Sequence, residues 1–180
     1  YEHAGVPILG RIEPPGRVEA GDLVWLDAAT VLAGRGYRTN AAGIGQLRTL
    51  LAPAGVEVVA APLPHGRGPE CCLHLMSLLS LLDETHAVVD ETWLSVPTLE
   101  LLHERGYRLV SIDPAERDAL AANVLSLGRR RLLAMEGSPV TRARLEAAGF
   151  EVRVFPGREL GTNGGGGPTC LTRPILRGES

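Results

Sequence analysis

Short apolar runs alternate along the chain with stretches whose apolar positions recur every three or four residues. Runs at residues 23–26 and 31–33 flank a polar turn and predict a β-hairpin. Over residues 40–51 the apolar positions have helical spacing, and they follow Asn40, a residue type that favours helix N-termini. Residues 56–61 form the next β-rich run. The first third of the chain is therefore predicted to fold as strand, strand, helix and strand.

The same succession of elements is predicted twice more. A glycine ends each predicted helix, at Gly55, Gly106 and Gly149, and a β-rich run follows each glycine. Glycine is common there because it tolerates the left-handed backbone at helix C-termini. The predicted elements of the second copy are 73–79, 87–89, 97–105 and 107–112, and those of the third are 124–127, 132–135, a helix from Ser138 or Pro139 to Ala148, and 150–155. We therefore predict an internal ββαβ repeat in one α/β domain over residues 1–180.

Composition narrows the classes of partner. Of the 180 residues 44% are apolar but only 4% are aromatic, so the core must be mainly aliphatic. A net charge of −3 argues against nucleic acid, because phosphate binding needs a clustered positive field. We interpret the arginines at 129–131 as a solvated turn between two strands. No apolar run approaches the roughly 20 residues that span a bilayer, and three cysteines predict no disulfide framework. We expect a cytoplasmic protein that binds neither nucleic acid nor membrane.

Cys170 is a candidate nucleophile. It follows a glycine run at residues 164–167, and such backbone lets a ligand approach closely. A reactive thiol must be accessible and must lie near groups that favour the thiolate. We expect a short apolar strand after the glycine loop, and a buried, inert cysteine is the alternative interpretation. No helical pattern follows the glycines, so they are not predicted to bind phosphate.

A histidine and two carboxylates are further candidates. The alternation around His74 predicts a strand on which His74 and Met76 share one face, although a structural histidine is the alternative. Glu19 and Asp22 lie three residues apart around a small Ala-Gly pair. They suit a pocket for a cation, because carboxylate and guanidinium groups are both forked. A polar turn is the alternative for this pair.

An arginine and a group of metal-ligand residue types need separate weighing. Arg38 could clamp a substrate carboxylate in a bidentate pair. His65, Cys71, Cys72 and His74 are close in sequence. Adjacent cysteines of a strand point to opposite faces, however, and no second ligand pair follows at zinc spacing. We therefore predict no metal site.

Taken in order, these segments resemble the dimethylarginine dimethylaminohydrolases and the related arginine deiminases and amidinotransferases. Residues 18–22 resemble the family segment with the active-site glutamate, 73–75 the segment with the catalytic histidine, and 166–170 the glycine loop that ends in the nucleophilic cysteine. Residues 38–43 are similar to the stretch whose arginine contacts the substrate carboxylate. Asn123 lies where the family has a matching feature. The likeness covers nearly all of the chain.

The resemblance implies a pentein fold, which is an α/β propeller of about five ββαβ modules around a central channel. This chain would hold about three to three and a half of the five modules. It would form the C-terminal portion of the catalytic domain. The family's earlier segment, with an acidic residue that grips the guanidinium, has no counterpart in this sequence.

The resemblance also implies hydrolysis of a guanidine, arginine or an N-methylated arginine, without metal or other cofactor. Cys170 would attack the guanidinium carbon and form a covalent thiouronium-type intermediate. His74 would be the general acid and then the base, and Glu19 would hold the guanidinium. The substrate-binding residues would be Arg38, Asp22 and Asn123. The products would be a ureido compound such as citrulline and an amine.

Met76 and the absent segment leave alternatives open. Arginine deiminases and amidinotransferases carry Asp two residues after the histidine, where this chain has Met76. This difference favours an activity like that of the dimethylaminohydrolases. An amidinotransferase, which passes the amidino group to an amine, is one alternative, and a non-catalytic pentein binding module is the other. An open pentein would expose sheet edges, which favours pairing into a homodimer.

Overall fold

The computed structural model describes residue 3 and residues 5–173, without the side chains of Leu160 and Thr162. These residues contain three separate three-stranded sheets. In each sheet the first two strands are antiparallel and the last two are parallel. A helix connects the parallel strands of each sheet. The predicted ββαβ repeat is thus confirmed for three successive units.

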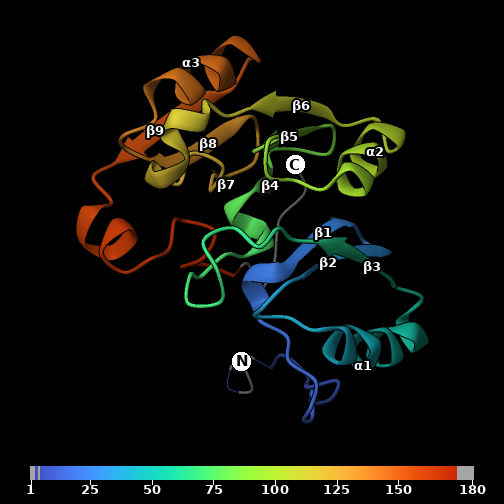
Figure 1. Cartoon of the computed structure of the whole chain (residues 1–180). Coiled ribbons are helices and arrows are strands. Elements are labelled where there is room, and N and C mark those ends of the chain that lie inside the picture. The colour runs from blue at the N-terminus through green and yellow to red at the C-terminus, as the bar shows by residue number, and fades with distance from the viewer. Residues whose placement is uncertain (1–2, 4, 174–180) are drawn as a thin grey trace.

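The units follow one another in the chain. Unit 1 consists of β1 (Leu23–Asp27), β2 (Thr30–Arg35), α1 (Ala41–Leu51) and β3 (Glu57–Pro62). Unit 2 consists of β4 (Leu79–Leu81), β5 (His86–Val89), α2 (Val96–Glu104) and β6 (Arg108–Ser111). Unit 3 consists of β7 (Leu125–Ser126), β8 (Arg131–Met135), α3 (Pro139–Ala147) and β9 (Glu151–Phe155). Figure 1 shows the three helices at the periphery. The first strands of the units are neighbours: β1 contacts β4, and β4 contacts β7.

The helix ends follow the sequence signals. Asn40 is the N-cap of α1, and its side chain accepts the Gly43 N–H at 2.8 Å. This bond satisfies a backbone donor that has no partner inside the helix. Gly55, Gly106 and Gly149 all have positive φ angles, between 71° and 88°. The predicted glycine stops after the three helices are therefore confirmed.

The core lies largely between the units and is mainly aliphatic. One cluster joins units 1 and 2 and a second joins units 2 and 3. Examples of fully buried leucines in these clusters are Leu32, Leu79, Leu102, Leu132 and Leu145. Each fully buried leucine contributes about 1.5–3 kcal/mol relative to an exposed one. Burial of apolar residues between the units therefore stabilises the fold and holds the units in their relative positions.

The strand predicted at residues 73–79 is wrong. Residues 73–79 do not form a strand, because a 3₁₀ turn at Leu75–Ser77 precedes β4. Leu75, Met76, Leu78 and Leu79 are buried and Leu73 is partly buried, so their spacing reflects burial of the whole segment and not a strand face. His74 and Met76 therefore share no strand face. Cys170 and Leu171 lie in a turn, and the rest of the apolar strand expected after the glycine loop falls outside the described residues.

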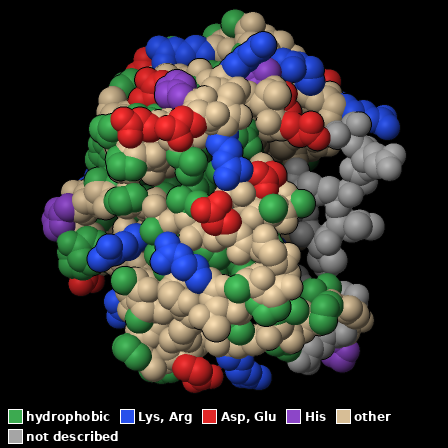
Figure 2. Space-filling model, turned by 90° about the vertical axis from the view of Figure 1, so that its right-hand side faces the viewer, with side chains coloured by type: hydrophobic (Ala, Val, Ile, Leu, Met, Phe, Trp, Pro, Cys, Tyr) green, Lys and Arg blue, Asp and Glu red, His purple; other side chains and the backbone are tan. Residues whose placement is uncertain are grey.

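Charges of both signs are interspersed on the face shown in Figure 2. Arg129 and Arg130 do lie in the turn that joins β7 to β8, whereas Arg131 is the first residue of β8. Arg130 is not simply solvated there: its guanidinium lies 4.3 Å from the centre of the Phe150 ring, and it donates to the Gly149 carbonyl at 2.9 Å. Within the described part of the chain, none of the helices has the length and apolar character needed to cross a membrane.

Candidate active site

Glu19 and His74 are in direct contact. Glu19 precedes a 3₁₀ turn, Ala20–Asp22, that leads into β1, and His74 precedes the turn Leu75–Ser77. The imidazole Nε2 lies 2.6 Å from Glu19 Oε2. An ionised carboxylate can only accept, so Nε2 is the donor. Gly21 allows this approach, because a Cβ at that position would lie 2.7 Å from His74 Cγ and Nδ1.

Glu19 also forms an ion pair with Arg38. Arg38 Nε lies 2.9 Å from Glu19 Oε1, and both side chains are 40% exposed. Thr39 Oγ1 accepts the Glu19 N–H at 3.0 Å, and this bond fixes the backbone of Glu19. Burial raises the pKa of Glu19, but hydrogen bonds from His74 and Arg38 outweigh it and hold this pKa below its ordinary 4.5. Glu19 is therefore an anion whose two oxygens face an imidazole and a guanidinium.

Asp22 is fully buried beside this pair. Its Oδ1 accepts the N–H of Leu75, the residue after His74, at 2.9 Å. Burial raises the pKa of Asp22 above its ordinary 3.8. Gly34 on β2 provides the space, since a Cβ there would lie 2.8 Å from Asp22 Oδ1. Asp22 thus anchors the turn that carries His74, and its predicted contact with substrate stays a prediction.

Cys170 lies in the turn after the glycine run, and its side chain is exposed. Its sulfur accepts a hydrogen bond from Asn123 Nδ2 at 3.0 Å. The same nitrogen donates to the Met76 carbonyl at 3.2 Å, and Asn123 Oδ1 accepts the Thr169 N–H at 2.9 Å. Gly167 packs against this amide, because a Cβ there would lie 2.4 Å from Asn123 Oδ1.

The three segments that carry the predicted catalytic residues adjoin one another. Arg173, three residues after the cysteine, donates to the Ala20 carbonyl beside Glu19. Its Nη1 lies 3.5 Å from Met76 Sδ, two residues after His74. Asn123 forms a second link between the Met76 carbonyl and the cysteine sulfur. Segments more than 90 residues apart in the chain therefore meet at one place.

Three polar residues of the site lie a few residues before the first strands of their units. Glu19 lies just before β1, His74 just before β4 and Asn123 just before β7. Because the first strands of the units are neighbours, the segments that lead into them are brought together as well. The repeat itself therefore gathers these side chains.

Sequence reasoning missed three contributors to this region. Gly21 is required by the packing of the imidazole, and its position between two carboxylates was the available signal. Cys72 Sγ lies 3.5 Å from His74 Nδ1, and burial raises the pKa of the Cys72 thiol. Arg173 reaches two distant segments, and no local pattern indicates such a long-range contact.

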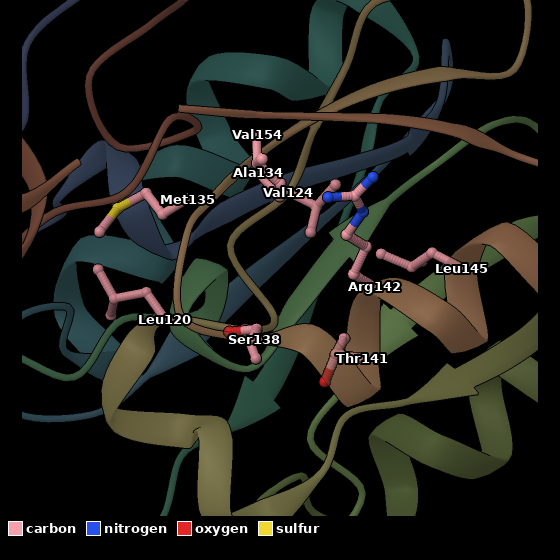
Figure 3. Close-up of a pocket in the computed structure, with 10 residues that line it drawn as sticks. Leu120, Val124, Ala134, Met135, Ser138, Thr141, Arg142, Leu145 and Val154 are labelled. Atoms are coloured by element: carbon pink, nitrogen blue, oxygen red, sulfur yellow. The ribbon is translucent and has the colours of Figure 1, made fainter. Parts of the chain in front are cut away.

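Two hollows lie away from these residues. Among the described residues no group of three or more His, Cys, Asp or Glu side chains has a metal-binding arrangement. The cavity in Figure 3, between Met135, Leu145 and their neighbours, measures about 10 Å³, which is near the minimum for one water. A wider groove of about 540 Å³ lies between the segments around His65 and Trp93. Neither hollow is lined by Glu19 or Cys170.

Known proteins share both this sequence and this fold. A family model described as arginine deiminase matches residues 84–177, just over half of the chain. An uncharacterized protein of Aeropyrum pernix is 34% identical over 169 residues, which cover 91% of this chain and 55% of that relative. The N(G),N(G)-dimethylarginine dimethylaminohydrolase of Streptomyces coelicolor is 32% identical over 137 residues, covering 76% of this chain and 46% of that protein.

Among solved structures, a cysteine-to-serine mutant of the dimethylarginine dimethylaminohydrolase from Pseudomonas aeruginosa, complexed with citrulline, superposes with a TM-score of 0.67. It is 26% identical, and the match covers 83% of this chain and 52% of that one. The fold is therefore that of the pentein proteins, an α/β architecture with mixed sheets. The chain belongs to the arginine deiminase family, within the superfamily of guanidine-modifying enzymes that its sequence resembles. It spans about half the length of the curated relatives that it matches.

Proposed function

We propose that the complete protein hydrolyses a guanidine of the arginine or N-methylated arginine type through a covalent intermediate on Cys170. The thiolate attacks the guanidinium carbon, and His74 gives a proton to the leaving amine. His74 then takes a proton from water, whose oxygen attacks the same carbon and displaces the sulfur. A ureido product such as citrulline is left. Because a guanidinium is resonance-stabilised, the reaction needs a strong nucleophile held in a fixed geometry.

Glu19 and Arg38 have complementary roles in this proposal. In the structure Arg38 Nε lies 2.9 Å from Glu19 Oε1, so a guanidinium already occupies one oxygen of the carboxylate. The substrate guanidinium would take this place, and the freed Arg38 would pair with the substrate carboxylate. One ion pair is thereby exchanged for two. Such an exchange favours substrates that carry both a guanidinium and a carboxylate.

The observation that carries the proposal is the meeting of three distant segments. Glu19 contacts the imidazole of His74 at 2.6 Å, and the Asn123 amide bridges the His74 segment and the Cys170 sulfur. A nucleophile, a proton carrier and an anion for a cationic substrate are the groups that guanidine hydrolysis requires. The Streptomyces coelicolor relative is a dimethylarginine dimethylaminohydrolase, whose name describes a reaction of this class.

The proposal concerns the complete protein, because the matched relatives are about twice as long as this chain. We propose that residues 1–180 are the C-terminal portion of a pentein catalytic domain. The rest of the ring would supply the missing contacts to the guanidinium. Three ββαβ units in this part of the chain are compatible with a ring of about five.

The test is turnover and mass spectrometry of the full-length protein with a panel of guanidines. We expect a ureido product and, after acid quench, an adduct on the Cys170 peptide. Cys170→Ser should lower turnover by about 10³-fold or more, whereas the control Cys71→Ser should leave it nearly unchanged. Adding an amine tests for a transferase, because a transferred amidino group changes the mass of the amine. Substantial turnover in Cys170→Ser would remove Cys170 from the nucleophile role.

A further inference from the structure

Asn123 is a buried amide in contact with the sulfur of Cys170. Only 1% of Asn123 is exposed, and its Nδ2 lies 3.0 Å from Cys170 Sγ. The family resemblance places Asn123 among the substrate-binding residues. Its neighbours in the structure are instead groups of the protein itself, namely the Cys170 sulfur, the Met76 carbonyl and the Thr169 N–H.

The orientation of the Asn123 amide follows from these neighbours. The Met76 carbonyl can only accept, so it must face Nδ2, at 3.2 Å. The Thr169 N–H can only donate, so it must face Oδ1, at 2.9 Å. A flipped amide would place Oδ1 against the Met76 carbonyl, so that two acceptors face each other, and Nδ2 against the Thr169 N–H, so that two donors face each other. The second Nδ2 hydrogen is therefore directed at the sulfur, and both amide hydrogens are in use.

Ser80 on β4 holds the Asn123 backbone from both sides. Its hydroxyl donates to the Ala122 carbonyl at 2.7 Å and accepts the Val124 N–H at 3.2 Å. Ser80 is itself buried, at 5% exposed. The donor is thus fixed before any substrate arrives, whereas the cysteine that it contacts lies in an exposed turn.

We infer that Asn123 is a catalytic residue that holds the Cys170 sulfur and stabilises its thiolate, in place of the predicted contact with substrate. This inference rests on the proposed function, in which Cys170 is the nucleophile. A neutral thiol is a weak acceptor, whereas an anionic acceptor receives a hydrogen bond roughly twice as strong. The Asn123 bond therefore strengthens when the thiol ionises, and it also fixes the direction of the attacking sulfur.

The experiment measures alkylation of Cys170 by iodoacetamide, read on the Cys170 peptide by mass spectrometry. It compares the full-length wild type with Asn123→Ala and Asn123→Asp at neutral and at strongly alkaline pH. Asn123→Ala should slow alkylation at neutral pH by about tenfold, because a hydrogen bond to a charged group is lost. At alkaline pH the thiolate forms without help, so the loss should be much smaller. Asn123→Asp should lose more at neutral pH, because a carboxylate repels the thiolate.

Two controls separate this role from general damage. Gln46→Ala removes an amide that also bonds twice to backbone, to Glu13, away from the site, and it should leave the ratio of neutral to alkaline rates unchanged. Cys71 in the same digest reports whether any variant opens the fold. Equal losses at both pH values in Asn123→Ala and Asn123→Asp, or no loss, would overturn the inference. Since alkylation needs no guanidine turnover, this outcome is independent of the test of the proposed hydrolysis.

Discussion

The two halves of the candidate site are built differently. The carboxylate and imidazole half lies on two 3₁₀ turns, and the buried Asp22 binds the backbone of one turn to the other. The thiol half lies on an exposed turn behind a glycine run, and its sulfur is held by the amide of Asn123. One half is thus fixed by close packing and buried polar contacts, and the other by the side chains of Asn123 and Arg173, which link a glycine-rich turn to the rest of the site.

This difference predicts how each half responds to added atoms. Close-packed groups have little room to relax, so an extra methyl must displace a functional side chain. A glycine-rich turn can shift its backbone and so relieve part of the clash that the added methyl group causes. Substitutions of glycines that contact the two halves therefore test the comparison directly.

The largest effect is expected from Gly21→Ala. The new Cβ would lie 2.7 Å from His74 Cγ and Nδ1, so the imidazole must leave its position on Glu19. If the proposed hydrolysis holds, a displacement of this kind costs about 100-fold in activity, which kcat/KM of the full-length protein measures. Gly45→Ala is the matched control, because nothing lies within 4 Å of its added Cβ. This control in α1 should gain about 0.5–1 kcal/mol of stability. Near-normal activity of Gly21→Ala would contradict the packing argument.

Gly167→Ala should have a smaller effect. Its Cβ would lie 2.4 Å from Asn123 Oδ1, but the neighbouring glycines let the turn move away at a cost of about 1 to 3 kcal/mol. We expect Gly167→Ala to slow the alkylation of Cys170. The fold-decrease in this rate should be smaller than the fold-decrease in turnover that Gly21→Ala causes. Gly165→Ala separates clash from backbone strain, because its φ is +72° and its Cβ would meet nothing within 4 Å. If Gly165→Ala slows alkylation more than Gly167→Ala, contact with Asn123 is not the cause.

The smallest effect is a pH dependence within the rigid half, where two carboxylates three residues apart are shifted in opposite directions. Burial raises the pKa of Asp22 above 3.8, so its contribution to stability is complete below that pH and is lost as the pH rises through the raised pKa. The pKa of Glu19 is lowered below 4.5, so its contribution is present above 4.5 and is lost as the pH falls through the lowered pKa.

Variants that remove each charge should therefore show opposite trends in urea unfolding. Asp22→Asn keeps an oxygen for the Leu75 N–H and should gain stability relative to the wild type as the pH rises from 3.8 through the raised pKa of Asp22. Glu19→Gln should lose stability relative to the wild type as the pH rises from the lowered pKa of Glu19 to 4.5, and the difference should stay constant above that pH. Parallel trends in the two variants would mean that the two carboxylates do not differ in environment.

Much of the fold could be predicted from local signals. The glycines after each helix and the cap at Asn40 mark the ends of elements, and these signals depend on backbone geometry that nearby residues determine. The strand predicted at residues 73–79 is wrong, because the apolar residues of this stretch pack around a 3₁₀ turn between two units. A segment that packs from several sides can show apolar spacing like that of a strand.

The site was predictable in its residue types but not in its contacts. Glu19, His74 and Cys170 are in recognisable local surroundings, so resemblance to a family could select them. The pairing of Arg38 with Glu19 and the bond from Asn123 to the sulfur depend on how distant segments pack. The arrangement of the units determines those contacts, and no short segment of the sequence predicts that arrangement.

The common location of Glu19, His74 and Asn123, each just before the first strand of its unit, has a consequence for how such chemistry arises. Each unit contributes a different polar group to one region: an anion from unit 1, an imidazole from unit 2 and an amide donor from unit 3. Exchanging whole units between relatives should therefore preserve the shape while mixing the chemical parts.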